Sequence, residues 1–472
     1  MLKSRAKVQA ELQPMAHQKA SLKHAAGTPI VYDTSDPGTG KTAVSIWDFA
    51  ARRRKRGGCA LILAPRSLLK SAWADDFKKF APDMKVSIAR ADNREDGFAE
   101  DADAYITNTD AVKWLAKQPK KFWDKFDTLI IDESTGYKHH TSQRSRAALK
   151  ISKYFTYRRG LTGTPNGRSI TDVWHQVMLL DGGQRLGQSF YAFRNAVCVP
   201  RQVGANANAV QWEDKDGAEE AVFGLLSDIV IRHKFEDCVD IPATHQYTIS
   251  YDLTPAQRTV YDTMQKDHVY VSLLAHIKGK FVKAQTVSAL AINAAAVATK
   301  LLQISSGALY TEDEAFSPVA NDRYKLVLDL VEGREHPLVF FFWKHQRDML
   351  IAEAESRGLT YAVIDGSTTD KERDAIVARY QRKQFDLLLA HPKSAGHGLT
   401  LTAGTSTIWP CPTYDLELFK QGNKRQARIG QKKKTEIIVI IANNTIEQGV
   451  YDILMKKDAR MTTLLDLFAS LT

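Results

Sequence analysis

A short glycine-containing run, SDPGTGKT at positions 35–42, holds the residues of this chain that are best suited to chemistry. In a loop of this kind, backbone N–H groups point at phosphates and the following helix presents the positive end of its dipole. The glycines let the backbone approach, the lysine reaches the outer phosphates, and the last hydroxyl can bind Mg²⁺. The usual pattern begins with a glycine, where Ser35 stands here. The candidate nucleotide ligands are Gly38, Thr39, Gly40, Lys41 and Thr42.

A second run, LIIDEST at 129–135, ends an apolar stretch with two adjacent carboxylates. Asp132 can hold Mg²⁺ through water, and Glu133 can orient the water that attacks a phosphate. Acidic residues after a strand are often only helix caps, so this run alone is a weak signal. Because it lies downstream of a phosphate loop in the same block, it predicts a hydrolytic site in which Lys41 and Glu133 are catalytic.

The elements that position these residues are indicated by short apolar runs. The runs alternate with polar, helix-prone segments, and apolar strands separated by helices are typical of parallel sheets covered on both faces. They form two blocks, one before about residue 180 and one after about residue 320. The runs lie at 28–35, 59–65, 103–110, 128–133, 337–343, 360–367, 385–392 and 435–444. We therefore expect an α/β fold with two parallel sheets flanked by helices.

The segment between the two blocks has a different pattern. Residues 241–253 are expected to form a strand, after which Thr254 and Pro255 are suited to the N-cap and first position of a helix. Ala-rich helical sequence continues to about residue 309. We expect a first lobe at 1–235, with a helical insertion at about 181–230, and a second lobe at 236–472. The second lobe would carry a helical protrusion at about 254–310 and the C-terminal motifs at 338–431.

Composition limits the class of protein. The 472 residues carry a net charge of +11, which favours an anionic partner, most commonly nucleic acid. The four cysteines form no CxxC pair, which argues against a disulfide scaffold, a zinc ribbon or an Fe–S site. The N-terminus has no apolar core of a signal peptide, and no apolar stretch is long enough to span a bilayer. We expect a protein of the cytoplasm.

Further runs extend the pattern in order along the chain. They lie at 61–80, 105–110, 159–183, 340–350, 363–381, 394–404 and, as QGNKRQARIGQ, at 421–431. Together with the phosphate loop and LIIDEST, they resemble the motifs of superfamily-two helicase motors, and more narrowly of compact, phage-encoded Swi/Snf-like ATPases. The resemblance covers nearly the whole chain. It implies two RecA-like lobes with helical protrusions, and ATP and Mg²⁺ bound at the lobe interface.

The resemblance also implies roles for residues that composition and spacing do not single out. Gln18, in ELQPMAHQ, corresponds to a glutamine that recognises adenine, whose edge an amide can match with one donor and one acceptor. Arg425 and Arg428 correspond to arginine fingers; on a helix, residues three apart share a face. Gly398 is implied as a nucleotide contact. The implied nucleic-acid contacts are Arg66, Thr107, Asn108, Ser394 and Thr400.

The activity implied is that of a nucleic-acid-dependent ATPase, most simply a monomeric translocase on double-stranded DNA that holds phosphates without reading sequence. A strand-separating or branch-migrating helicase is the alternative. A nucleotide-switched DNA clamp stays open because Thr135 and Thr400 stand where the family usually has His and Asn. The basic run RRRKR at 52–56 is either a solvated helix end or a further DNA contact.

Overall fold

The computed structural model describes residues 13–202, 210–238, 242–277, 297–310, 316–395, 399–428 and 430–469. The chain divides into two compact units. Unit 1 comprises Met1–Val203, Val210–Asp240 and Lys457–Thr472, and unit 2 comprises Gly204–Ala209 and Ile241–Lys456. The sequence led us to expect the whole C-terminal part in the second lobe, whereas the last residues belong to unit 1.

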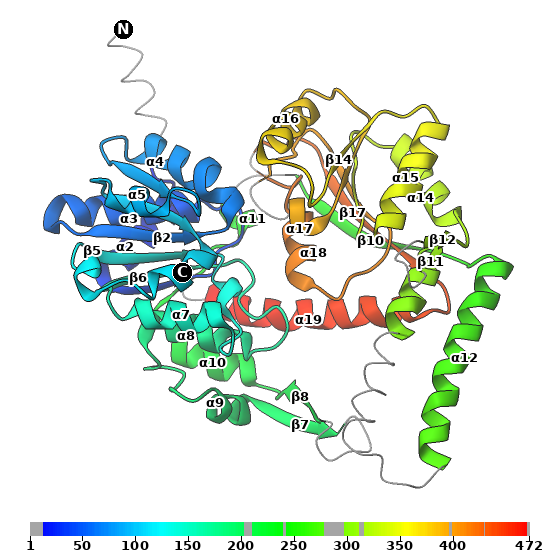
Figure 1. Ribbon diagram of the computed structural model, residues 1–472, viewed down its shortest axis with the longest axis horizontal. Coiled ribbons are helices and arrows are strands. Elements are labelled where there is room, and N and C mark those ends of the chain that lie inside the picture. Colours follow the sequence, from blue (N-terminus) through cyan, green and yellow to red (C-terminus); the bar gives the residue numbers. More distant parts are fainter. Residues whose placement is uncertain are drawn as a thin grey trace. The chain divides into compact units, whose positions relative to one another are not determined.

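Unit 1 contains a seven-stranded sheet in the order β3-β4-β2-β5-β6-β1-β9, in which all neighbouring strands are parallel (Figure 1). Its strands are β1 (Ile30–Asp33), β2 (Cys59–Ala64), β3 (Val86–Ala89), β4 (Ala104–Asn108), β5 (Phe126–Asp132), β6 (Tyr157–Leu161) and β9 (Val230–Ile231). In β2, Leu61 and Leu63 belong to one hydrophobic cluster, and Ala60 and Ile62 belong to another. Since successive side chains point to opposite faces, both faces of this sheet are apolar and need a cover.

Helices supply that cover on both faces of the sheet. Phe49 of α3 packs in the cluster that contains Ile62, whereas Ile151 of α7 packs in the cluster that contains Leu61. In the described part of unit 1, the α-helices outside the insertion at about 181–230 and the C-terminal helix are α2 (Ala16–Gly27), α3 (Lys41–Arg56), α4 (Asp75–Phe80), α5 (Arg94–Ala99), α6 (Val112–Leu115), α7 (Gln143–Ser152), α8 (Asp172–Asp181) and α11 (Phe235–Cys238). The prediction of a parallel sheet flanked by helices is confirmed for this unit.

The insertion expected at about 181–230 is only partly helical. It contains α9 (Phe190–Val197) and α10 (Ala218–Leu226), with an antiparallel pair of strands between them, β7 (Cys198–Gln202) and β8 (Val210–Asp214). Residues 198–202 and 210–214, which lie within the insertion that we expected to be helical, are therefore strands. The buried Asp214 anchors the hairpin, because its carboxylate accepts hydrogen bonds from Ser169 Oγ and from the Ile170 N–H at 3.0 Å.

Unit 2 contains a six-stranded sheet in the order β10-β17-β16-β13-β15-β14, again with all neighbours parallel. Its strands are β10 (Thr244–Tyr251), β13 (Leu338–Phe340), β14 (Tyr361–Ile364), β15 (Leu387–Ala390), β16 (Ser406–Trp409) and β17 (Thr435–Ala442). Its helices include α12 (Pro255–Ile277), α14 (Asp322–Glu332), α15 (Lys344–Ser356), α16 (Asp370–Gln381), α17 (Pro392–Ala395) and α18 (Leu416–Asn423). A short antiparallel pair, β11 (Ala308–Tyr310) and β12 (Phe316–Pro318), completes it. The second parallel sheet is thus confirmed.

The protrusion of unit 2 begins as the sequence indicates. Helix α12 starts at Pro255, and the Thr254 hydroxyl accepts a hydrogen bond from the Gln257 N–H at 3.2 Å. A side-chain cap of this kind satisfies one of the N–H groups that a helix leaves unpaired at its start. Residues 297–305 are helical as well, and 278–296 lie outside the described residues.

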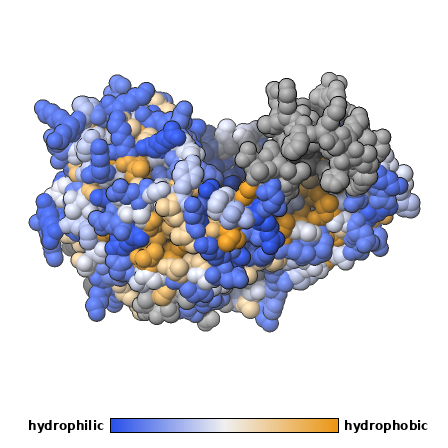
Figure 2. All heavy atoms as spheres, turned by 90° about the horizontal axis from the view of Figure 1, so that it is seen from below, coloured by the Kyte–Doolittle hydropathy of each residue, from blue (hydrophilic) through white to orange (hydrophobic). Residues whose placement is uncertain are grey.

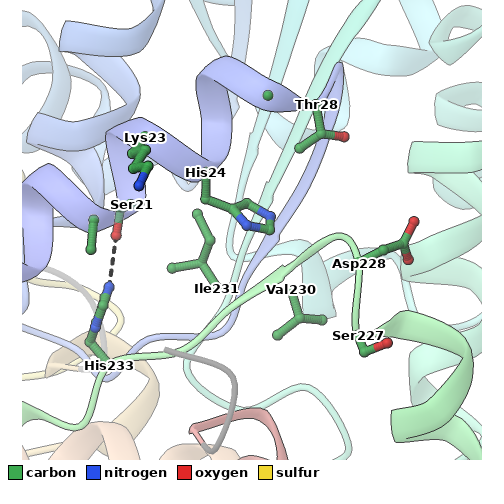
Figure 3. Close-up of a pocket in the computed structure, with 11 residues that line it drawn as sticks. Ser21, Lys23, His24, Thr28, Ser227, Asp228, Val230, Ile231 and His233 are labelled. Atoms are coloured by element: carbon green, nitrogen blue, oxygen red, sulfur yellow. Dashed lines mark hydrogen bonds between the residues drawn. The ribbon is translucent and has the colours of Figure 1, made fainter.

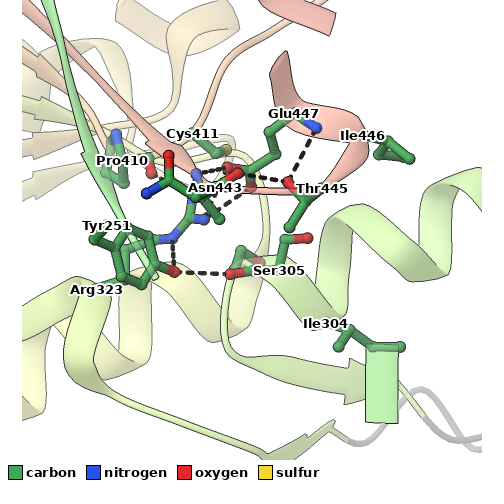
Figure 4. Close-up of polar contacts among 12 residues, drawn as sticks. Tyr251, Ile304, Ser305, Arg323, Pro410, Cys411, Asn443, Thr445, Ile446 and Glu447 are labelled. Carbon is green, nitrogen blue, oxygen red and sulfur yellow. Dashed lines mark hydrogen bonds and ion pairs between the residues drawn. The ribbon is translucent and has the colours of Figure 1, made fainter. Parts of the chain in front are cut away.

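A buried ion pair holds the base of this protrusion (Figure 4). Arg323 Nη2 donates to both carboxylate oxygens of Glu447 at 2.9 Å, and the two side chains are 1% and 0% exposed. The guanidinium also donates to Tyr251 OH at 2.9 Å and to the Pro410 carbonyl. Tyr251 OH donates to Ser305 O at 3.0 Å. Because a buried charge is stable only when its hydrogen-bonding groups are satisfied, these contacts bind strand β10 to α14 and to the helix that carries Glu447.

That helix is α19 (Ile446–Ala469), and its last part belongs to unit 1. Arg460 Nη1 lies 3.3 Å from Asp214 Oδ2, and Lys234 Nζ lies 2.9 Å from Asp466 Oδ1. These ion pairs explain why the C-terminal residues group with the first sheet rather than with the second.

The surface is mostly hydrophilic in the view of Figure 2, where hydrophobic residues come to the surface in separate patches. The large hydrophobic side chains that are exposed are Met15, Tyr191, Val199, Leu225, Tyr247, Tyr414 and Ile453. Single exposed apolar residues of this kind are ordinary for folded proteins. Among the helices in the described ranges, none is both long and apolar enough to cross a membrane.

Candidate active site

The candidate residues of unit 1 lie at the carboxyl ends of neighbouring strands. The phosphate loop follows β1, the run 162–165 follows β6, and Asp132 is the last residue of β5. The sheet order places β5, β6 and β1 side by side, and parallel strands bring their carboxyl ends to the same edge. The structure therefore gathers the loop, the two carboxylates and the threonine-rich run at one edge of the sheet.

The phosphate loop has the backbone geometry that its glycines predict. Gly38 and Gly40 have φ angles of 93° and 85°, in the left-handed region that favours glycine, and α3 begins directly after Gly40. Lys41 Nζ donates to Ser35 O at 2.6 Å and to Asp36 O at 3.1 Å. The ammonium group is thus already directed across the loop.

Side chains of neighbouring segments pack closely on the glycines of this loop. A Cβ atom on Gly40 would lie 2.3 Å from Gln18 Nε2, and one on Gly38 would lie 2.9 Å from the Phe235 ring. The side chain of Asp36 is anchored by Arg232, whose Nη2 lies 2.8 Å from Oδ1. The loop is therefore held from both sides, by α2 and by the segment that follows β9.

Gln18 lies on the phosphate loop itself. Its Oε1 accepts a hydrogen bond from the Met15 N–H at 2.9 Å, and its Nε2 donates to Thr39 O at 3.3 Å. The side chain of His17 also contacts Thr39 O, at 2.8 Å. An amide has two acceptor and two donor positions, so one of each is left for an adenine edge. The adenine role stays a prediction, to which the structure adds a second function, support of the loop.

The two carboxylates differ sharply in environment. Asp132 is 9% exposed, and its Oδ2 accepts a hydrogen bond from Trp73 Nε1 at 2.9 Å. Burial raises the pKa of the Asp132 carboxyl, while the bond from Trp73 and the positive charge of Lys41 act in the opposite direction. Glu133 follows with a φ of 52°, a left-handed conformation that turns the chain away from the strand. Its N–H donates to Asp132 Oδ1 at 3.1 Å.

The run 162–165 borders the same loop. The Thr162 N–H donates to Asp33 O at 3.0 Å, and a Cβ on Gly163 would lie 2.9 Å from Pro37 Cδ. Among the residues that the structure describes, the buried Thr164 hydroxyl and the buried Asn166 amide lack hydrogen-bond partners. Buried polar groups are normally satisfied, so these atoms beside the loop fit a site that receives a polar ligand.

The donor set suits a nucleotide with Mg²⁺. The Thr42 hydroxyl is in the first turn of α3, and Asp132 ends a strand at the same edge of the sheet. Within the described ranges there is no cluster of three His, Cys, Asp or Glu residues that could enclose a metal. Mg²⁺ is usually held by one or two protein oxygens together with phosphates and water, which these two residues can supply.

The three nucleic-acid candidates of unit 1 have different surroundings. Arg66 is exposed just after β2, and Asn108 is half-buried at the end of β4, where its Oδ1 accepts a hydrogen bond from Arg94 at 3.3 Å. Thr107 is 0% exposed, and its hydroxyl donates to Ala89 O at 2.6 Å. The Thr107 side chain is therefore held within the strand, and the predicted contact of this residue with phosphate stays a prediction.

The arginines of the basic run 52–56 are engaged within unit 1. Arg52 pairs with Asp48 at 3.0 Å, and Arg53 pairs with Asp103 at 2.7 Å. Arg54 pairs with Asp83 at 2.7 Å, which is the more exposed of these contacts. Such pairing favours the interpretation of the run as the end of a helix over that of a DNA contact.

Arg425 and Arg428 do not lie on a helix, contrary to our assumption. Helix α18 ends at Asn423, and the chain continues as turns in which the Arg425 N–H donates to Gly422 O at 3.2 Å. The Leu401 N–H donates to Arg425 O at 2.9 Å, which keeps that carbonyl out of a helical ladder. Arg425 is 3% exposed, whereas Arg428 is half-buried.

The remaining candidates of unit 2 surround the same turns. Arg428 Nη1 contacts Thr400 Oγ1 at 3.4 Å, and Arg428 Nε donates to Lys424 O at 2.9 Å. Ser394 is half-buried in the short helix α17, with its N–H donated to His391 O at 2.9 Å. Gly398 lies outside the described residues. The unusual Thr400 is thus in contact with one of the two candidate fingers.

A cavity of about 650 Å³ opens behind α2 (Figure 3). It is lined by residues 20–28 of α2 and its end and by residues 227–233, rather than by Gln18 or the phosphate loop. Ser21 Oγ lies 2.8 Å from His233 Nε2 at one end of it. Burial, followed by the charge of Arg159, lowers the pKa of His24, which points into the cavity.

The sequence analysis did not predict the hydrogen bonds that two side chains of this site make. Trp73 lies in the run 61–80, but its hydrogen bond to Asp132 was not predicted. Gln176 was not singled out, although it is 1% exposed and bonds Ser134. The available signal was a polar residue inside the apolar helix VWHQVMLL.

Comparison with known proteins gives two matching family models. The SNF2-related domain matches residues 30–300, and the helicase conserved C-terminal domain matches residues 322–430. The first match alone covers more than half of the chain. The two matched regions contain the phosphate loop, both carboxylates and the two candidate finger arginines.

Relatives match along most of this chain. Protein p41 of Acyrthosiphon pisum secondary endosymbiont phage 1 is 28% identical, over 86% of this chain and 87% of its own. An uncharacterized ATP-dependent helicase of Mycoplasma genitalium is 25% identical over 89% of this chain, which spans only 39% of that helicase. The solved Sulfolobus solfataricus SWI2/SNF2 ATPase core in complex with dsDNA is 19% identical, with coverage of 97% and 95% and a TM-score of 0.44.

Proposed function

Since the chain belongs to the SNF2-related domain family and is therefore an ATP-hydrolysing enzyme with two RecA-like lobes, we propose that it is a DNA-stimulated translocase. It would move along double-stranded DNA without separating the strands. The observation that carries the proposal is the gathering of Lys41, Asp132 and Glu133 at one edge of the sheet of unit 1. Hydrolysis needs a cation for the outer phosphates, a metal ligand and a base for water, and these three residues supply them.

Each residue has a chemical role in this proposal. Lys41 neutralises charge on the outer phosphates, and the backbone N–H groups of the loop hold them at the N-terminus of α3. Glu133 accepts the proton of the attacking water. Thr42 and Asp132 would hold Mg²⁺, which when bound offsets the charge that develops on the phosphates.

The further nucleotide contacts are assigned by the resemblance. We propose that Gln18 and Gly398 contact the nucleotide and that Arg425 and Arg428 stabilise the charge of the transferring phosphoryl group. The fingers lie in unit 2 and the phosphate loop in unit 1. Turnover would then depend on an arrangement of the two units that brings both sets of residues to one nucleotide.

The preference for DNA is supported by charge and by residue type. The net charge is +11, and the exposed Arg66 and the polar side chains of Asn108, Ser394 and Thr400 suit contacts to phosphate. Such contacts carry no base information, so binding would be independent of sequence. Relatives matched along the chain include a DNA annealing helicase and endonuclease of Bos taurus and a chromodomain-helicase-DNA-binding protein of Mus musculus.

The test is a phosphate-release assay with duplex DNA, single-stranded DNA or RNA as activator. We expect duplex DNA to stimulate most, longer duplexes to stimulate more, and stimulation to fall steeply with salt. The enzyme should also displace the third strand of a triplex while leaving a blunt duplex intact. Stimulation by RNA with duplex DNA inert would contradict the choice of substrate.

Two other outcomes would assign a different activity. Release of a labelled strand, with best stimulation by single strands or forks, would identify a strand-separating helicase. ATP-dependent DNA binding without length dependence or displacement would identify a clamp.

A further inference from the structure

One buried side-chain amide, that of Gln176 in α8, connects the segments that carry the candidate active site. We propose that Gln176 is a positioning residue that acts through Ser134 to hold Glu133 in line for water activation. The inference rests on the proposed ATPase function and concerns the same site. Gln176 is 1% exposed, Ser134 is 1% exposed and Tyr32 is 0% exposed, so the connection lies wholly in the interior of unit 1.

All four hydrogen-bonding positions of this amide are used. Gln176 Oε1 accepts from Ser134 Oγ at 2.8 Å and from Tyr32 OH at 3.0 Å. Gln176 Nε2 donates to Pro165 O at 2.8 Å and to Asp172 O at 2.9 Å. An amide offers two acceptor and two donor positions and no more, so none is left for another partner.

The partners also determine which way the amide faces. Pro165 O and Asp172 O are carbonyl oxygens that only accept, so the nitrogen must point at them. Burial raises the pKa of Tyr32, which therefore keeps its O–H and donates to the oxygen. A carboxylate or an apolar side chain at position 176 could not make this set of contacts.

Three of the partners adjoin residues of the candidate site. Ser134 follows Glu133 directly, and Pro165 ends the run 162–165 that packs on the phosphate loop through Gly163. Tyr32 precedes the loop in β1. A displacement at Glu133 is therefore transmitted by one rigid amide to the neighbouring run and to α8.

Glu133 needs such support because of its backbone. Its φ of 52° and ψ of 59° are left-handed, a conformation that a residue with a side chain keeps only when its surroundings enforce it. On one side Asp132 Oδ1 accepts the Glu133 N–H, and the Gly136 N–H donates to Glu133 O at 2.9 Å. The Ser134–Gln176 bond fixes the next residue. In this family the fourth position of the run that begins with the two carboxylates is usually His, and Thr135 stands there in this chain. Ser134, at the third position, is connected to the run 162–165 through Gln176.

The expected signature is kinetic. Gln176 and Ser134 are not among the residues proposed to touch ATP or DNA, so their loss should lower kcat and leave the KM for ATP nearly unchanged. Small misplacements of a catalytic group are enough to lower turnover by one to two orders of magnitude.

The test compares two single-atom deletions at the same amide oxygen. Ser134→Ala and Tyr32→Phe each remove one hydroxyl donor to Gln176 Oε1, but only Ser134 adjoins Glu133. We expect Ser134→Ala to lower DNA-stimulated kcat about tenfold or more, with a change in KM below about threefold, and Tyr32→Phe to stay within about threefold of the parental kcat. Thermal unfolding of both variants serves as the control, because a purely structural amide would make them lose stability and activity in parallel. Equal kcat values for the two variants would overturn the inference.

A double-mutant cycle tests the path through Ser134. Gln176→Leu should lower kcat at least as far as Ser134→Ala, and the double variant should be no slower than Gln176→Leu alone, because both changes remove one connection. If the two substitutions lowered kcat by factors that multiply in the double variant, the proposed path through Ser134 would be overturned. If the unaltered chain shows no DNA-stimulated turnover, the proposed function itself fails. If it turns over and Ser134→Ala does so at the parental rate, only the inference fails.

Discussion

The two units share one plan, a parallel sheet between helices, yet they present their candidate catalytic residues in different ways. In unit 1 the residues follow strands directly, and each is held by the chain around it, as Lys41 is by the loop carbonyls and Asp132 is by Trp73. In unit 2 the two arginines lie in turns after α18, supported by backbone contacts to the segment at Leu401. Unit 1 therefore presents an assembled site, and unit 2 presents cations on an irregular segment.

The largest effect should come from the unit 2 side. Arg428→Ala is expected to lower DNA-stimulated turnover on the order of a thousandfold, since a finger acts mainly on the transition state. The affinity for ATP should change little, as measured by equilibrium binding of a fluorescent nucleotide. Arg382→Ala, an exposed arginine after α16, is the matched control. A large loss of ATP affinity with normal turnover at saturation would contradict the finger role.

The next effect tests the unit 1 side. Glu133→Gln is expected to keep ATP binding and to lower turnover on the order of a hundredfold, because the amide cannot accept the proton of water. Lys41→Ala should lower turnover by a similar factor. Glu95→Gln, at an exposed position on α5, should be neutral. Parental turnover in Glu133→Gln would mean that unit 1 holds a different site.

Acid should weaken both units through one buried histidine in each. Burial lowers the pKa of His175 and of His345 to about 4. The unfolded chain binds a proton on each near pH 6.5, while the folded chain does not, so stability is lost as pH falls from about 6.5 toward 4. Each histidine should lower the free energy of unfolding by about 2 kcal/mol at pH 5 relative to pH 7.

Chemical denaturation at both pH values, with His175→Gln and His345→Gln, measures the two contributions separately. Each substitution should reduce the pH dependence of the unfolding free energy of the unit that contains it. An unaltered slope in both variants would show that other groups set the acid limit.

The smallest effect concerns the base of the nucleotide. Gln18→Ala should reduce the preference for ATP over GTP by about tenfold or less, the value of one lost pair of hydrogen bonds. Because Gln18 also bonds Thr39 O, the variant should in addition raise the KM for both nucleotides. An unchanged preference, with KM raised alike for ATP and GTP, would leave Gln18 only its support of the loop.

Strands of the two sheets were predictable where they were apolar and regular. The apolar runs contain β1, β2, β4, β13, β14, β15 and β17 and overlap most of β5, and the run at 241–253 contains β10. Strands β3, β6, β9 and β16 were missed. Strand β6, with the sequence YRRGL, carries two arginines whose charges are met by partners far away in the chain, such as Asp48 for Arg159 at 3.0 Å. Because these partners are distant in the sequence, no local pattern predicts a buried strand here.

The site was predictable to the extent that residues follow one another in a local motif. The phosphate loop is of this kind, and its glycines have the expected positive φ. The burial of Thr107 and the position of Arg425 and Arg428 in turns were not predictable in this way, because burial and helix ends depend on packing. The Thr107 hydroxyl is taken up by Ala89 O of the neighbouring strand, and α18 stops two residues before Arg425.

The pairing of β10 with β17 has a consequence for synthesis of the protein. These strands are the first and the last of their sheet in the sequence, and the paired Thr244 and Thr435 are 191 residues apart. At ordinary ribosomal speeds, β10 waits roughly 10–40 s for its partner. An unpaired strand is a hazard for aggregation, yet most side chains of THQYTISY stay exposed even in the finished sheet. Because β10 is polar, it can stay unpaired during synthesis with a low tendency to aggregate. Both units are completed only when helix α19 has been synthesised.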